Sequence, residues 1–340
     1  MIVSLSEASA LPRAVQMLAD GGLLGLPTET VYGLAADASN DTAVARIFAA
    51  KGRPANHPLI VHVSDADGGL SGLQHFAHDV PDFARALAVA FWPGALTLIL
   101  PRRADVATAA AGGQESIGVR CPSHPGAQAL LQALRQRPEG VIWGLAAPSA
   151  NRFGRVSPTT AAHVQSELGP DLLILDGGPC QLGIESTIVD CTRGQPVLLR
   201  PGSISAEALA RACGQPVRSP SEFAAATAPR ASGTLESHYA PRARVRLFDA
   251  QALQEALQGA HLEQGASPTP LAVYARSFVP QAAPGLILQA MAFTAAQVAQ
   301  ELFAVLRALD DAGVQEIWVE RVPVTLEWAG VADRLQRASA

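Results

Sequence analysis

The chain has 340 residues, which is enough for about two ordinary domains that each bury a core. Hydrophobic residues make up 49% and charged residues 16% of the chain, which excludes intrinsic disorder, and no uncharged apolar run of about eighteen residues predicts a membrane span. The formal net charge of −5 excludes the broad basic surface that nucleic-acid binding requires. We therefore expect a globular protein without membrane attachment or stable direct binding of nucleic acid.

The N-terminal sequence and the cysteines do not indicate secretion. The first residues lack a basic segment followed by an apolar one, so we predict a cytoplasmic location. The four cysteines form no Cys-x-x-Cys pair and have no histidine at ligand spacing, so we expect reduced structural thiols.

Short apolar runs alternate with helical patterns over the first two hundred residues, which is typical of an α/β domain. The predicted elements are strand 23–26, helix 41–50, strand 59–63, helix 82–91, and strands 96–100, 116–120, 141–147, 172–175, 186–190 and 197–200. Several connections between these strands are too short for a crossover helix. The sequence therefore predicts a twisted mixed sheet flanked by helices.

The composition changes after Cys213, and residues 215–230 are rich in Pro, Ser, Ala and Thr, which is typical of a linker. The elements predicted beyond it are strand 245–248, helix 251–257, strands 271–274 and 286–289, helix 294–312 and strand 316–320. They indicate a second, smaller open-sheet α/β domain. We divide the chain into an N-terminal domain (1–214), a linker (215–243) and a C-terminal domain (244–340).

A single lysine, Lys51, stands among the 25 basic residues, and all the others are arginines. A compact ammonium group can follow a phosphate oxygen as a point charge, whereas a guanidinium is a planar fork. Lys51 and Arg53 follow a predicted helix where Gly52 permits a turn, so together with His57 they could face one anion. By composition alone, the lysine could equally be a chance survivor at a helix end.

Several polar residues lie at or near predicted strand ends. Residues 27–34 bring hydroxyls, a carboxylate and a phenol to the end of a strand, where ligand crevices form in open sheets, although a simple capping loop explains them equally well. His62 lies in an apolar strand, where a histidine is more often a core residue. Arg120 and Arg200 end strands, where arginine side chains also extend to solvent without a ligand.

Residues 147–158 combine hydroxyls and an amide with small residues, which allows backbone N–H groups to approach a phosphate closely. No Gly-x-Ser-x-Gly sequence frames Ser149, and no Walker, His-Glu-x-x-His or dinucleotide motif occurs. The residues thus offer positive charge and hydroxyl groups, without a protein nucleophile.

Six segments together resemble the YrdC-like family of threonylcarbamoyl-AMP synthases in order and spacing. They are residues 27–34, 51–62, 116–120, 147–158, 183–190 and 199–202. The sequence His238-Tyr239-Ala240-Pro241 and the extra α/β domain are similar to the long, two-domain form of these enzymes, so the resemblance covers nearly the whole chain. Two places depart from the family pattern. Long-form linkers commonly carry Ser-Pro-Gly and a basic residue before His-Tyr-Ala-Pro, whereas this chain has Ala231-Ser232-Gly233 and then residues 234–237 with Glu236. His57 lies where asparagine is frequent.

The resemblance implies a nucleotidyltransferase that condenses ATP, L-threonine and bicarbonate into threonylcarbamoyl-AMP and pyrophosphate, with Mg²⁺ bound to the nucleotide. The product serves threonylcarbamoyladenosine modification of tRNA, with possible hand-over to the transfer machinery. Domain 1–214 would be catalytic and segment 215–243 would form a lid over the active site. Ligands for the metal stay unassigned.

The resemblance also implies which residues of this chain bind the substrates, because the family's site residues have matching positions in this sequence. The threonine site would consist of Thr30, His62, Arg120, Ala147 and Ser186. The nucleotide site would consist of Lys51, Arg53, His57, Ser116, Ser149, Asn151, Ser157, Arg200 and the lid residue Tyr239. Lys51 and Arg53 would be the catalytic residues, because a carbamate oxygen attacks the α-phosphorus and the protein only needs to position groups and neutralise charge.

Two other functions fit parts of the pattern. A carbamoyltransferase of the hydrogenase-maturation type also makes an adenylate, but it is accompanied by paired Cys-x-x-Cys zinc modules, which this sequence lacks. A non-catalytic RNA-binding module would use a cationic cleft, but the acidic net charge and the missing aromatic and basic interleaving argue against it. For the C-terminal domain, the sequence suggests only a regulatory or docking role.

Overall fold

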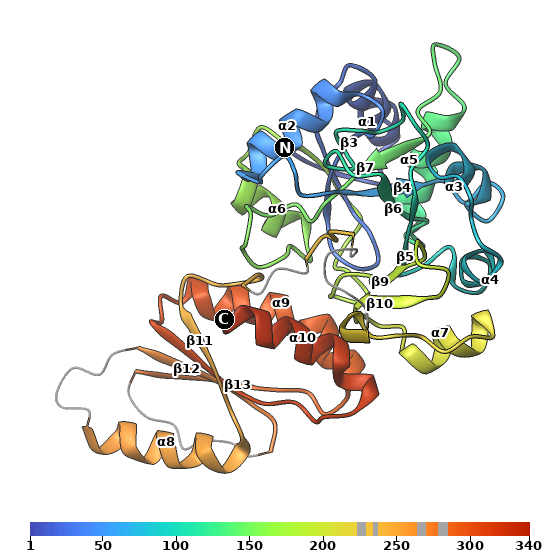
Figure 1. Cartoon of the computed structure of the whole chain (residues 1–340). Helices are drawn as coiled ribbons and strands as arrows, with labels where there is room; N and C mark the ends of the chain where they lie inside the picture. The colour runs from blue at the N-terminus through green and yellow to red at the C-terminus, as the bar shows by residue number, and fades with distance from the viewer. Residues whose placement is uncertain (223–228, 234–236, 264–269, 278–284) are drawn as a thin grey trace. The chain divides into compact units, whose positions relative to one another are not determined.

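The computed structural model describes residues 1–222, 229–233, 237–263, 270–277 and 285–340 (Figure 1). The chain divides into two compact units, one of Met1–Phe153 with Ser157–Thr234 and the other of Gly154–Val156 with Leu235–Ala340. The division falls inside the predicted linker, whose residues 223–228 and 234–236 lie outside the described ones. Within the described residues, no helix is both long and apolar enough to cross a membrane.

The first unit contains one large sheet and its helices. Its strands are β1 (Ile2–Ser4), β2 (Leu24–Leu26), β3 (Gly33–Asp37), β4 (Ile60–Val63), β5 (Leu96–Pro101), β6 (Ser116–Arg120), β7 (Gly144–Ala146), β8 (Leu173–Asp176), β9 (Thr187–Asp190) and β10 (Val197–Arg200). Its helices are α1 (Ala10–Ala19), α2 (Asp41–Lys51), α3 (Leu70–Phe76), α4 (Asp82–Phe91), α5 (Pro125–Arg135), α6 (Ala161–Leu168) and α7 (Ala206–Cys213), followed by a short 3₁₀ turn at Pro220–Glu222.

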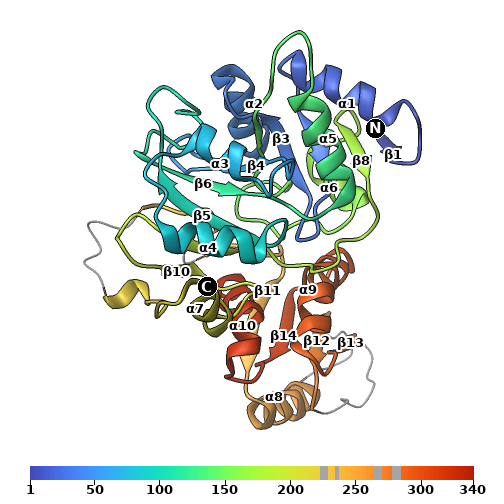
Figure 2. The same cartoon turned by 90° about the vertical axis from the view of Figure 1, so that its right-hand side faces the viewer.

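The strands of this sheet follow the order β1-β8-β2-β3-β7-β4-β6-β5-β9-β10. The sheet contains both parallel pairs, such as β4 with β6 and β5 with β9, and antiparallel pairs, such as β2 with β3 and β5 with β6. The predicted mixed sheet flanked by helices is therefore confirmed (Figure 2). The register places Thr97 of β5 and His62 of β4 on either side of Arg120 of β6.

Two clusters of buried side chains form the core of the first unit. One joins α1 and α5 to strands β2 and β8, and the larger one joins α2, α3 and α4 to the central strands. Asn40 caps the start of helix α2, because its side chain accepts a hydrogen bond from the Ala43 N–H, and Gly52 caps the end in the left-handed conformation with φ 61°. This ending makes Lys51 the last helical residue.

Strand β3 was not predicted. Its residues extend the polar segment 27–34 into Ala35, Ala36 and Asp37, and alanine and aspartate have low strand propensity. The strand forms because it is buried between β2 and β7, with which it pairs antiparallel. Residues 27–32 therefore form the connection between the neighbouring strands β2 and β3.

The second unit is a four-stranded, wholly parallel sheet with the order β11-β14-β12-β13. Its elements are β11 (Arg244–Phe248), α8 (Ala250–Glu263), β12 (Leu271–Ala275), β13 (Leu286–Ala290), α9 (Ala295–Asp311), β14 (Glu316–Glu320), a 3₁₀ turn at Leu326–Trp328 and α10 (Ala329–Ala338). Helix α8 packs on one face, against Val273 and Trp318, while α9 and α10 lie on the other face (Figure 1). The predicted second open-sheet α/β domain is confirmed.

Candidate active site

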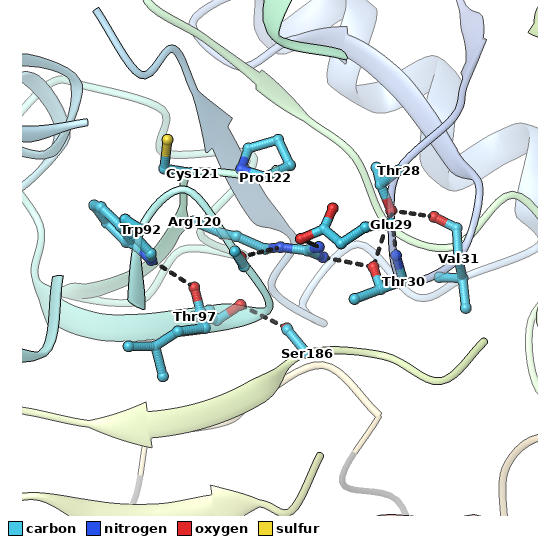
Figure 3. Close-up of polar contacts among 12 residues, drawn as sticks. Thr28, Glu29, Thr30, Val31, Trp92, Thr97, Arg120, Cys121, Pro122 and Ser186 are labelled. Carbon is cyan, nitrogen blue, oxygen red and sulfur yellow. Dashed lines mark hydrogen bonds and ion pairs between the residues drawn. The ribbon is translucent and has the colours of Figure 1, made fainter. Parts of the chain in front are cut away.

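A buried ion pair between Glu29 and Arg120 lies in the first unit (Figure 3). The Arg120 Nη2 lies 2.6 Å from the Glu29 Oε1, and both side chains are at most 5% exposed. Burial alone would raise the pKa of Glu29, but the charge and hydrogen bonding of Arg120 outweigh it and hold the pKa below its usual value. The pair is thus ionised, with one arginine fixed at the end of β6.

Two further contacts orient the Arg120 guanidinium. Its Nη1 donates to the Thr30 Oγ1 at 2.8 Å, and its Nε donates to the Gly94 carbonyl at 3.3 Å. The Thr30 hydroxyl is itself 2.9 Å from the Thr28 hydroxyl, which donates to the Val31 carbonyl at 2.6 Å (Figure 3). Two of the predicted threonine-site residues, Thr30 and Arg120, are therefore in direct contact.

The hydroxyl of Ser186, which is also predicted to contact threonine, is the centre of a second set of contacts. It lies 2.8 Å from the Thr97 Oγ1 (Figure 3). It also accepts a hydrogen bond from the Arg200 Nη2 at 3.2 Å. Arg200 Nε also donates to the Ser186 carbonyl at 3.1 Å. Since Arg200 is a predicted nucleotide residue, Ser186 joins the two predicted substrate sites.

His62 is buried in β4 as the register partner of Arg120. Burial, together with the positive charge of Arg120, lowers the pKa of His62 to about 3, so its imidazole is neutral at physiological pH. Its Nδ1 makes no hydrogen bond with any described residue. A neutral ring beside Arg120 adds no second charge and leaves one polar atom for a ligand.

Ala147 directly follows β7 and is buried. Its N–H donates to the Ile60 carbonyl at 3.0 Å, which ties this residue to the strand that carries His62. A Cβ on Gly33 would lie only 3.1 Å from the Ala147 Cβ, so this part of the site is tightly packed. Four of the residues predicted to bind threonine thus lie on β4, on β6, in the connection between β2 and β3, and directly after β7.

Lys51 is buried, and its ammonium group donates to the backbone carbonyls of Ser149 and Asn151. Its own carbonyl accepts a hydrogen bond from the Phe153 N–H at 2.8 Å. Burial, with a smaller contribution from the nearby Arg53 charge, lowers its pKa well below the usual value. Lys51 therefore fixes the loop that carries two predicted nucleotide residues.

Arg53 and His57 both contact one aromatic ring, that of Phe153. The Arg53 Cζ is 5.6 Å from the centre of the Phe153 ring, and the His57 ring meets the same ring edge to face at 5.5 Å. Burial and the charges of Arg53 and Arg230 lower the pKa of His57. Arg53 is buried and its Nη2 also donates to the Pro58 carbonyl at 2.9 Å.

Arg53 and Arg200 converge on Ser232. The Arg53 Nη2 donates to the Ser232 Oγ at 3.3 Å, and the Arg200 Nη1 donates to the Ser232 carbonyl at 2.9 Å. Gln114 holds the neighbouring backbone, because its Oε1 accepts from the Arg230 N–H at 2.8 Å. Ser116 lines the small pocket beside this segment. The linker residues 229–233 thus lie against three predicted nucleotide residues.

The remaining predicted nucleotide residues occupy two places. Ser149 and Asn151 lie on the loop that Lys51 holds, and the Ser157 hydroxyl donates to the Glu185 Oε1 at 2.5 Å. Tyr239 belongs to the second unit, where its ring lies 5.3 Å from Phe303. Its predicted nucleotide contact and the predicted lid stay predictions.

Three residues outside the predicted site hold it together: Glu29, Thr97 and Ser232. Glu29 had a sequence signal, since it is the only carboxylate in the strand-end segment 27–34. Thr97 lies inside an apolar strand pattern, and Ser232 inside the linker. For those two, only the folded arrangement reveals the contact.

Two family models match the chain. A model of Sua5, YciO and YrdC proteins, described as telomere recombination, matches residues 16–202, and a model described as the threonylcarbamoyl-AMP synthase C-terminal domain matches residues 204–340. Together they cover both units of the fold.

Full-length relatives agree with these matches. The threonylcarbamoyl-AMP synthase of Pyrococcus abyssi is 36% identical over 342 residues, covering 96% of this chain and 93% of its own. That of Bacillus subtilis is 36% identical over 340 residues, covering 97% and 92%. The crystal structure of P. abyssi Sua5 complexed with L-threonine superposes with a TM-score of 0.86 at 34% identity, covering 100% of this chain and 97% of that one. The predicted resemblance is confirmed, and the chain belongs to the threonylcarbamoyl-AMP synthase family.

Proposed function

We propose that this protein condenses L-threonine, bicarbonate and ATP into threonylcarbamoyl-AMP and pyrophosphate. The observation that carries the proposal is the contact of Ser186 with Arg200. Ser186 also contacts Thr97, which lies beside Arg120 in the sheet. The contact with Arg200 therefore links the residues predicted to bind threonine with those predicted to bind the nucleotide. A reaction that joins an amino-acid derivative to an α-phosphate needs these two sites side by side.

The threonine part of the site presents complementary charges and hydroxyl groups. Arg120 is held by Glu29, Thr30 and Gly94, so its planar fork is oriented before a carboxylate arrives. Bicarbonate and the threonine amine form a carbamate with loss of water. A carbamate oxygen then attacks the α-phosphorus, and the bond from this phosphorus to the oxygen of the β-phosphate breaks, which releases pyrophosphate.

The nucleotide part would act by neutralising charge. Arg53 and Arg200 converge on Ser232, so a triphosphate that enters there would compete with Ser232 for their N–H groups. Mg²⁺ would enter bound to the triphosphate as part of the substrate and offset charge on the leaving pyrophosphate. Lys51 would keep Ser149 and Asn151 in place beside the phosphates.

The product is a mixed anhydride that water hydrolyses, so its use by an enzyme of tRNA threonylcarbamoylation would follow soon after its formation. Purified protein incubated with ATP, Mg²⁺, bicarbonate and single amino acids tests the proposal. We expect pyrophosphate release that requires both threonine and bicarbonate. Release that instead requires carbamoyl phosphate would support the carbamoyltransferase alternative and contradict the proposal.

A further inference from the structure

The second unit contains a large hollow at the carboxyl ends of its parallel strands. Its volume is ≈ 1110 Å³, and its lining residues include Leu247 and Asp249 at the end of β11, Arg276 after β12, and Glu320 and Arg321 at the end of β14. In open α/β sheets, ligands bind at this edge, where connections leave the strands in different directions. The volume is sufficient for a small organic molecule.

Most charges that line this hollow are neutralised by neighbours within the second unit. Arg321 pairs with Asp249 at 3.7 Å, and Arg337 pairs with Asp333 at 2.9 Å. The buried Glu320 carboxylate accepts hydrogen bonds from the backbone N–H groups of Arg276 and Ser277, at 2.7 Å and 2.8 Å. Glu320 therefore fixes the backbone at Arg276 without pairing with its side chain.

The Arg276 side chain differs from these neighbours. Its guanidinium forms no ion pair with any described residue, and its Nε is buried without a hydrogen-bond partner there. The Arg276 Cζ lies 5.4 Å from the centre of the ring of Trp328, which is itself buried. An aromatic ring stabilises a cation but satisfies none of its N–H groups. A buried and unpaired N–H is costly, so an anion in this hollow would be favourable.

The remaining wall of the hollow is largely apolar. Val322, Pro323 and Ala329 line it, together with Val324 and Leu326, which are 104% and 54% exposed. Large exposed aliphatic side chains beside a concave surface are typical of ligand sites. The wall thus suits the hydrocarbon or aromatic body of a ligand, while Arg276 suits its charged head.

We infer that the second unit binds a small organic anion, with a single carboxylate or phosphate-like head on Arg276 and an apolar body against Val322, Pro323 and Leu326. This site is separate in the chain from the proposed synthase site, and its existence does not depend on that function. It gives the C-terminal domain a ligand-binding role that the sequence alone does not indicate.

Anilinonaphthalene sulfonate, an aromatic monoanion, is a suitable probe, and N-phenylnaphthylamine is its uncharged counterpart. Fluorescence titration of the full chain should show saturable binding of the sulfonate that Arg276→Gln weakens about tenfold or more. Arg321→Gln, which removes a paired and exposed cation of the same hollow, is the matched control and should change the affinity by less than about twofold. Arg276→Lys keeps the charge and should retain most of the binding.

Dye bound elsewhere on the chain is unaffected by a substitution at Arg276, so the difference between the variants measures this site. Affinity for the uncharged dye should be the same in the unmodified chain and in the variants of Arg276 and Arg321. Circular dichroism checks folding. If Arg276→Gln unfolds, Leu326→Glu at an exposed position places a negative charge in the apolar wall and should weaken binding of the sulfonate more than binding of the uncharged dye. Equal sulfonate affinities for Arg276→Gln and Arg321→Gln, or no saturable binding by the unmodified chain, would overturn the inference.

Discussion

Glu29 and Arg120, which are 91 positions apart in sequence, form an ion pair with 2.6 Å between Oε1 and Nη2. Both side chains are almost completely buried. Neither charge is stable alone in such a place, because burying an unpaired ion costs several kcal/mol. The pair therefore fixes a cation beside Thr30 and His62, where we propose that the threonine carboxylate binds.

Replacing Glu29 tests how far the pair supports the fold. Glu29→Gln keeps the shape of the side chain but leaves the buried Arg120 charge unpaired, so we expect the free energy of unfolding to fall by about 3 kcal/mol or more. Chemical denaturation followed by circular dichroism measures it. Glu115→Gln is the control, since Glu115 lies 4.0 Å from Arg102 and is 96% exposed. Equal stability of the two variants would mean that the pair is not ionised.

Arg120→Lys should weaken threonine binding about a hundredfold, which corresponds to about 2.7 kcal/mol. A lysine cannot keep the contacts with Glu29, Thr30 and Gly94 and still offer a planar fork to a carboxylate. Isothermal titration calorimetry with threonine and with ATP separates the two substrates.

Arg102→Lys is the matched control for that variant, because Arg102 is also buried and also donates to backbone carbonyls, those of Gln114 and Val106. Both variants should lose stability, whereas only Arg120→Lys should lose threonine affinity. Comparable threonine affinity of both variants would contradict the proposal that Arg120 binds threonine.

Lys51→Met should lower the rate of adenylate formation about a hundredfold or more, because the loop at Ser149 and Asn151 loses its ammonium donor. Arg46→Met, on the same helix, is the control, since Arg46 is exposed and, among the described residues, its side chain donates only to the Gly21 carbonyl. Pyrophosphate release under saturating substrates is the measurement. Equal rates of the two variants would show that Lys51 neither positions the loop for the reaction nor takes part in catalysis.

The buried His62 makes stability depend on pH. Its pKa falls from 6.5 to about 3 on folding, so below pH 6.5 the unfolded chain binds a proton that the folded chain does not. The stability contributed by the neutral ring is therefore complete above pH 6.5 and is lost as the pH falls toward 3. Between pH 6.5 and pH 5 this loss amounts to about 2 kcal/mol.

His62→Gln removes this titration, so its unfolding free energy should fall by about 2 kcal/mol less than that of the unmodified protein over the same pH range. Urea unfolding at the two pH values compares them. All the other histidines are the same in both proteins, so their contributions cancel in the difference. Parallel losses in the two proteins would show that His62 is accessible to protons when folded.

Much of the fold follows from local patterns. Strands β6, β10 and β14 and helix α4 have the predicted bounds, because each is a compact apolar or amphipathic run with clear ends. Helix α10 was not predicted, since no side chain caps its start and its inner face includes Arg334, which is completely buried. Arginine is rarely buried, so a sequence pattern assigns it to the surface.

The sequence predicted candidate site residues one at a time but not the contacts among them. Thr30, Arg120 and Ser186 were identified from motif resemblance, and the structure brings Thr30 and Arg120 into contact. The partners Glu29 and Ser232 were not, because their contacts depend on which strands are neighbours and on where the linker lies. Long-range pairing of this kind is decided by the whole fold.

The most direct test of the account uses bicarbonate labelled with carbon-13, together with ATP, Mg²⁺ and threonine, and mass spectrometry of the adenylate. We predict a threonylcarbamoyl-AMP that is one mass unit heavier than the product from unlabelled bicarbonate, with pyrophosphate released in equal amount. An adenylate that contains no labelled carbon, or pyrophosphate release that is independent of bicarbonate, would contradict the proposed function.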